Sequence, residues 1–196
     1  VNAQPADLKA ILQATVSTPT SKSAKVVDNV LGSSLWKGLP AAEKANLAKV
    51  MAAAGEKGLV ALGAALEGTP ELAKATDRDG KSMLQGLADL ATQPLNAALY
   101  AGTTKQKILD DVLLQIANPD RVEQGNAPTC TVTSMQFELV RDEAAEYVRL
   151  MAGLTGPKGK IEMRGGGDLK LDPDTLATLD KRPTAQAIFQ NAAMEY

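Results

Sequence analysis

Apolar side chains recur every three or four residues along most of this chain, the spacing that places them on one face of an α-helix. The clearest run is capped by Thr103 or Thr104 and ends at Asn118, and its apolar residues are Ile108, Leu109, Val112, Leu113 and Ile116. Helices are predicted over residues 5–16, 26–35, 40–54, 56–67, 69–76, 82–91, 95–100, 103–117, 129–140, 142–154, 172–179 and 183–194. The helix over 26–35 is expected to end or bend at residues 32–34.

One segment alternates with a period of two instead. Residues 160–164 alternate between polar and apolar side chains, three glycines follow at 165–167, and residues 169–171 resume the alternation. This arrangement predicts two short strands joined by a glycine turn. The expected fold class is therefore mainly α, with one small β-hairpin.

The pattern divides the chain into two expected domains. Residues 1–118 are predicted to form an all-helical bundle with Trp36 as a core anchor, and residues 1–23, rich in Ser, Thr and Pro toward their end, are a candidate mobile arm. No repeat of about 20 to 50 residues is convincing, so a solenoid is not predicted. Residues 119–196 are expected to form a second unit around Cys130. We expect this unit to be incomplete at its C-terminus, because the last helical pattern runs into Tyr196 without a cap.

The composition narrows the classes of function. The 196 residues include 21 basic and 23 acidic side chains, with no basic block and only 3% aromatic residues, so nucleic-acid binding is disfavoured. One cysteine excludes a disulfide within the chain. No apolar run reaches the length of a membrane span, and no signal peptide opens the chain, so a soluble protein is predicted.

Residues 77–82 form a predicted turn that matches two ligand-binding motifs incompletely. A calcium loop of the EF-hand type would need an oxygen ligand at Lys81 and a glutamate at Ala88. A phosphate-binding P-loop would need a glycine at Ala75 and a strand before it. We therefore expect neither a metal nor a cofactor.

Cys130 is the side chain with the greatest nucleophilic potential. Pro128 interrupts the preceding structure and Thr129 is a suitable N-cap, so Cys130 is predicted to lie in the first turn of a helix. There the unpaired backbone N–H groups and the positive end of the helix dipole favour thiolate over thiol. Gln124, six residues upstream, is expected to reach the same point.

Gln124 followed at this spacing by Cys130 on a helix start resembles the papain and calpain type of cysteine peptidase. The similarity covers the chain from about Asp110 to its C-terminus and extends to calpain-like segments of large bacterial proteins, some of them secreted effectors. It implies that Cys130 is the nucleophile of a thiol protease, with Gln124 as a donor in the oxyanion hole. It also implies a peptide or amide-like substrate, and that residues 119–196 are the Cys-bearing helical subdomain of a papain-like fold.

Two features depart from that family. Thr131 stands where the family commonly has an aromatic residue, and the chain has no histidine. A Cys–His pair cannot form within the chain, so we expect it to be inactive alone, as the N-terminal fragment of a longer hydrolase. The resemblance implies that the histidine lies beyond Tyr196, in a C-terminal remainder of the same protein. The implied setting is the bacterial cytoplasm or a secreted effector.

A second interpretation is that the chain is a non-catalytic helical interaction or effector module. A lone cysteine is often a small buried apolar side chain without chemistry. In that case Cys130 is structural, Gln124 only ends a loop, and the helical half of the chain docks a protein partner.

Overall fold

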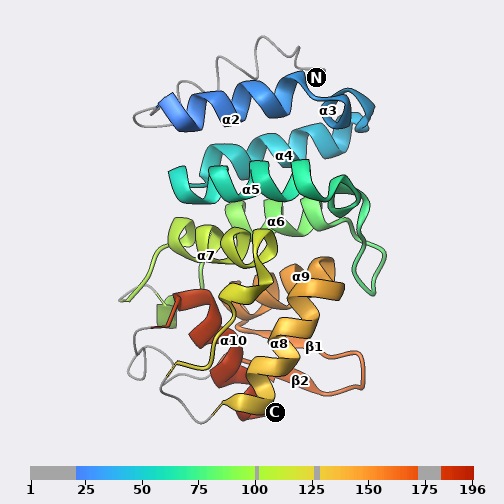
Figure 1. The fold of residues 1–196 in the computed structure, drawn as a ribbon. Coiled ribbons are helices and arrows are strands. Elements are labelled where there is room, and N and C mark those ends of the chain that lie inside the picture. The colour runs from blue at the N-terminus through green and yellow to red at the C-terminus, as the bar shows by residue number, and fades with distance from the viewer. Residues whose placement is uncertain (1–20, 100–101, 126–128, 172–181) are drawn as a thin grey trace.

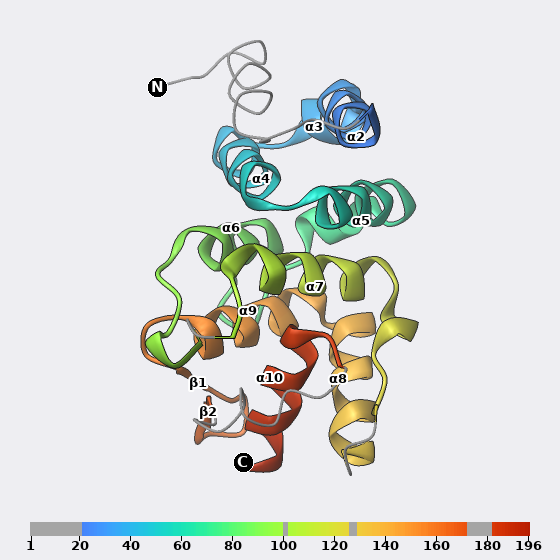
Figure 2. The ribbon, with the colours of Figure 1, turned by 90° about the vertical axis from the view of Figure 1, so that its left-hand side faces the viewer.

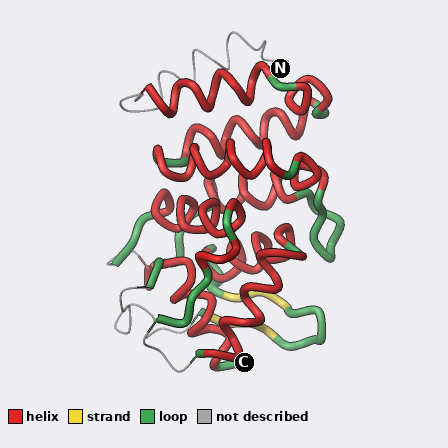
Figure 3. The backbone as a smooth tube through the Cα atoms, in the orientation of Figure 1, coloured by secondary structure: helices red, strands yellow, loops and turns green. Residues whose placement is uncertain are grey.

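The computed structural model describes residues 21–99, 102–125, 129–171 and 182–196. Within these ranges the chain forms nine α-helices, three short 3-10 helices and one antiparallel strand pair (Figures 1 and 3). The α-helices are α2 (Ser21–Gly32), α3 (Ser34–Gly38), α4 (Ala41–Ala53), α5 (Glu56–Gly68), α6 (Met83–Thr92), α7 (Lys105–Ala117), α8 (Cys130–Asp142), α9 (Ala144–Thr155) and α10 (Thr184–Met194). The other elements are η1 (Pro70–Lys74), η2 (Ala97–Leu99), η3 (Pro119–Arg121), β1 (Lys160–Glu162) and β2 (Asp168–Lys170).

The expected fold class, mainly α with one small hairpin, is confirmed. In the hairpin Ile161 faces Leu169 across the ladder, and Gly166 and Gly167 have φ values of 86° and 76°, a conformation that favours glycine. Side chains of Ser33, Ser82 and Thr104 start α3, α6 and α7, each accepting a hydrogen bond from a backbone N–H three residues on. Local capping thus sets the starts of these three helices.

The break expected at residues 32–34 is confirmed, because α2 ends at Gly32 and α3 begins at Ser34, although α2 begins earlier than predicted, at Ser21. Two other predictions of secondary structure need correction. The helices expected over 69–76 and 95–100 are reduced to η1 and η2 in the described residues. After η1, Thr76 pairs with Ser82 in an isolated antiparallel bridge, which pulls the chain out of the helix. The helices predicted over 5–16 and 172–179 lie outside the described residues.

The helices are stacked in two rows. One row runs α2, α5, α7 and α10, and the other runs α4, α6 and α9, each helix packing on the next in its row (Figures 1 and 2). Helix α8 packs against α9 and α10 at the end far from α2 (Figure 2). The cysteine helix therefore lies at the opposite end of the molecule from the first described helix.

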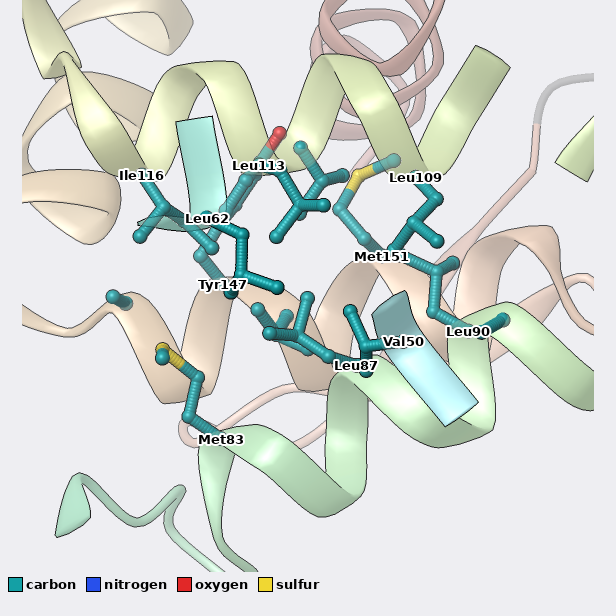
Figure 4. Packing of buried hydrophobic residues seen from close by; sticks show 14 of the residues in the cluster. Val50, Leu62, Met83, Leu87, Leu90, Leu109, Leu113, Ile116, Tyr147 and Met151 are labelled. Carbon is teal, nitrogen blue, oxygen red and sulfur yellow. The ribbon is translucent and has the colours of Figure 1, made fainter. Parts of the chain in front are cut away.

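One hydrophobic cluster runs through this stack. Trp36, the expected anchor, is 3% exposed in the upper part, and Tyr147 meets Phe189 edge to face at 5.7 Å between ring centroids in the lower part. In Figure 4, buried side chains of α6, α7 and α9 interlock in the middle: Met83, Leu87, Leu90, Leu109, Leu113, Ile116, Tyr147 and Met151. Packing is thus continuous across position 118, and the division into two domains stays a prediction.

Two neighbouring aspartates of α7 hold the starts of two other helices. Asp110 accepts a hydrogen bond from the Gly55 N–H at the start of α5, at 2.8 Å. Asp111 accepts one from the Ala185 N–H at the start of α10, at 3.3 Å. Negative charge is favourable at a helix N-terminus, so α7 aligns both helices through its carboxylates.

The turn over residues 77–82 is held by hydrogen bonds within it and by a hydrogen bond to α9. Asp77 accepts hydrogen bonds from the backbone N–H groups of Asp79 and Lys81. The turn rests on α9, where Arg149 and Glu146 form a buried pair at 2.8 Å. Burial opposes ionisation of Glu146, but the hydrogen bonds from Arg149 and from the Arg78 N–H hold its pKa below the usual range.

The described part of the chain contains no helix with the length and apolarity needed to cross a bilayer. Among the described Cys, Asp and Glu residues, no group of three or more is placed to hold a metal ion.

Candidate functional site

Cys130 is the first residue of α8 and is exposed, so its predicted place in the first turn of a helix is confirmed. The interpretation of Cys130 as a small buried side chain is wrong. Only one side of α8 packs inward, and its buried residues are Val132, Gln136 and Val140. The thiol therefore lies on the outer side of a helix of 13 residues, at its positive end.

Thr129 precedes the cysteine as expected, but its side chain does not act as a cap. It is 4% exposed, and its hydroxyl lies 3.2 Å from the side-chain oxygen of Gln190 on α10. Its carbonyl accepts from the Thr133 N–H at 2.7 Å and from the Thr133 hydroxyl at 2.8 Å. The first-turn N–H groups of α8 thus receive no cap from Thr129, and such groups favour an anion.

A chain of buried hydrogen bonds supports this helix start from below. Arg182 donates to the Gln190 side-chain oxygen at 2.7 Å, and the Gln190 amide then donates to Gln136 at 3.0 Å. Gln136 donates to the Tyr147 hydroxyl at 3.2 Å, and that hydroxyl donates to Gln115 at 2.5 Å. An arginine side chain can only donate, so the Gln190 oxygen must accept and the Gln190 amide must donate. This fixes which group donates and which accepts in each later hydrogen bond of the series.

This network is buried and uncharged beyond Arg182. Burial raises the pKa of Tyr147 far above its usual range, so the hydroxyl keeps its proton and remains a donor. Gln136 and Gln190 are both fully buried. The network connects α7, α8, α9 and α10 and fixes how α8 sits on its neighbours.

Gln124 lies at the surface and follows Glu123, which is bonded to α10. The carbonyl of Glu123 accepts hydrogen bonds from the side-chain amides of Gln186 and, at 3.5 Å, Gln190. Gly125 has φ 62°, which turns the chain just after Gln124 in a way that favours glycine. Residues 126–128 are not described, so the approach of the Gln124 side chain to the thiol stays a prediction.

The buried glutamines were missed by the sequence analysis. Gln186 and Gln190 lie four residues apart in α10, on the same face as buried apolar side chains, and this spacing was the available signal. Gln136 breaks the apolar face of α8 in the same way. A glutamine on an apolar helical face indicates a buried polar network, because a buried amide requires partners.

No protein-family model, no curated protein and no solved structure matches this chain. The resemblance to papain- and calpain-like peptidases therefore remains a hypothesis about the site.

Proposed function

We propose that this chain is the cysteine-bearing N-terminal part of a bacterial papain- or calpain-like cysteine peptidase. Cys130 is the nucleophile and Gln124 donates to the oxyanion. Residues 119–196 form the helical subdomain of the papain-like fold, and a C-terminal remainder of the protein supplies the histidine base. The substrate is a peptide or amide-like bond, and the protein acts in the bacterial cytoplasm or as a secreted effector.

The observation that carries this proposal is the exposed thiol at the first turn of α8. An anionic sulfur there lies at the positive end of the helix dipole, near first-turn N–H groups that the Thr129 side chain does not cap. The Glu123 carbonyl, next to Gln124, and the Thr129 hydroxyl, next to Cys130, both bond to α10. Anchored neighbours favour catalysis, because an oxyanion hole needs donors that are already in place.

The test compares two reactions of the same thiol. With p-nitrophenyl acetate, the thiolate attacks the carbonyl, a carbon–sulfur bond forms through an oxyanion, and p-nitrophenolate leaves as the acetyl thioester is made. With iodoacetamide, the thiolate displaces iodide and no oxyanion forms. An oxyanion donor therefore accelerates only the first reaction.

We predict that Gln124→Ala slows acetylation of Cys130 by about tenfold or more. Alkylation by iodoacetamide is expected to change less than about twofold, because that transition state carries no carbonyl oxyanion. Gln106→Ala, at an exposed glutamine of α7, is the matched control and should change neither rate. Both rates are measured on the intact chain by mass spectrometry, with Cys130→Ala as the blank.

Equal slowing of both reactions by Gln124→Ala would mean that Gln124 acts on thiol access rather than on the oxyanion. No slowing of either would remove Gln124 from the site. Either result contradicts the proposal and favours the interaction module.

The second candidate function, a helical interaction module, is favoured by a separate observation. An open groove lies in the helical half of the chain, between α2, α3 and α5, far from Cys130 in the stack.

A further inference from the structure

The groove between α2, α3, α5 and η1 has a volume of about 1190 Å³. Val30 of α2, Leu39 after α3 and Leu66 of α5 contribute apolar side chains to its walls. Val60 of α5 also lines it and is 40% exposed, unusual for a large apolar residue on a helix that packs on two others. The helices around it are at the N-terminal end of the stack in Figures 1 and 2.

The groove suits a peptide better than a small molecule. Its volume is above the range of about 300–1000 Å³ that small-molecule sites occupy. Such sites also need a few converging polar groups. Here Glu43 is already bonded to Ser82 at 2.8 Å, and no groove residue has a buried polar side-chain atom without a partner among the described residues. Recognition would therefore depend on apolar area and overall charge.

Charge around the groove favours a basic ligand. Of the described residues that line it, Asp28, Glu43 and Glu67 are acidic, and Lys74 is the single cation. The acidic side chains thus outnumber the basic one, and the neutral polar residues of the lining are Asn29, Ser33, Ser34 and Ser82. An apolar floor with an acidic rim is complementary to a helix that has leucine-like residues on one face and lysine or arginine on the other.

The chain's own N-terminal segment is a poorer match. Residues 5–16 have helical apolar spacing, but they carry one acidic and one basic side chain, Asp7 and Lys9. Their net charge is zero, so the acidic rim favours them less than it favours a basic helix. We propose that this groove binds a basic amphipathic helix of a partner protein. The proposal is independent of any role of Cys130.

The probe is a synthetic peptide of about 18 residues, built from leucine and lysine with leucines at helical spacing. Binding to the full chain is measured by fluorescence anisotropy. We expect it to bind, while an isomer of the same composition with scrambled spacing and a leucine–glutamate analogue bind at least about tenfold more weakly. Affinity should fall as salt is raised, because the rim charges are exposed to solvent.

Two variants locate the site. Val60→Asn and Glu67→Lys, both at exposed positions and so compatible with folding, should each weaken binding about tenfold or more. Asp120→Lys, on η3 away from the groove, changes the net charge by the same amount as Glu67→Lys and should leave affinity unchanged. Circular dichroism confirms that each variant is folded.

Several results would overturn the proposal. Equal binding of the scrambled isomer, or no loss in Val60→Asn, would show that the peptide does not use this groove. Stronger binding after Leu8→Asp would identify residues 5–16 as the occupant. Self-association of the chain that Val60→Asn abolishes would identify a second copy.

Discussion

At the scale of single residues, a close contact joins Asp110 to the start of α5. Burial raises the pKa of this carboxyl, while its hydrogen bond to the Gly55 N–H opposes the shift. A Cβ atom on Gly58 would lie 2.9 Å from the Asp110 carboxyl carbon and 3.2 Å from its Cα. The glycine therefore serves a close approach between α5 and α7, rather than a special backbone conformation.

Gly58→Ala should lower the free energy of unfolding by about 1–3 kcal/mol, because overpacking against a backbone outweighs the gain in helix propensity. The matched control is Gly68→Ala at the other end of α5, where an added Cβ meets nothing within 4 Å. That change should be neutral or stabilise by up to about 1 kcal/mol. Urea unfolding measures both, and equal effects would mean that the α5–α7 contact is loose.

At the scale of elements, α10 depends on a charge from another helix. Asp111 of α7 accepts from the first backbone N–H groups of α10, and burial raises the pKa of its carboxyl against the effect of those bonds. An aspartate with a raised pKa favours folding at acidic pH. This contribution is complete below the unfolded pKa of about 3.9 and is lost as pH rises through the folded pKa.

Asp111→Asn keeps an acceptor for the Ala185 N–H but removes the ionisation. We therefore expect the stability of Asp111→Asn relative to wild type to increase as pH rises from about 3 to 7. Asp111→Ala should lose the cap and cost about 0.5–2 kcal/mol at neutral pH. The measurement is urea unfolding at several pH values. A relative stability of Asp111→Asn that is flat or falls with pH would contradict the assigned direction of the pKa shift.

At the scale of the whole molecule, the two rows of helices share one core. Helix α6 contacts both α4 and α9, so the half that contains Trp36 and the half that contains Cys130 are held by the same layer. The buried glutamine network adds polar connections among the last four α-helices. Such continuity favours cooperative unfolding of the described part of the chain.

Trp36, the single tryptophan, and far-ultraviolet circular dichroism should report one coincident urea transition. Leu150→Ala, in α9 and 1% exposed, should lower the free energy of unfolding by about 2–5 kcal/mol and shift both signals together. If the urea transition reported by Trp36 is the same in Leu150→Ala as in the wild type, the result would instead support two independent domains divided near residue 118.

Interactions between near neighbours were accessible from the sequence alone. Apolar spacing predicted α7 and α10, a threonine cap marked the start of α7 at Thr104, and a glycine turn marked the hairpin. The place of Cys130 at a helix start also followed from its flanking residues. These features depend on residues within a few positions of one another, so periodicity and capping rules are enough to find them.

Only the tertiary structure decided which residues far apart in the chain meet. Gly55 and Asp110 are 55 positions apart, Gln136 and Gln190 are 54, and Asp111 and Ala185 are 74. The exposure of Cys130 and the groove beside Val60 likewise result from how whole helices pack. Such contacts depend on the summed packing of many side chains, whereas a local pattern reports only the face that each helix buries.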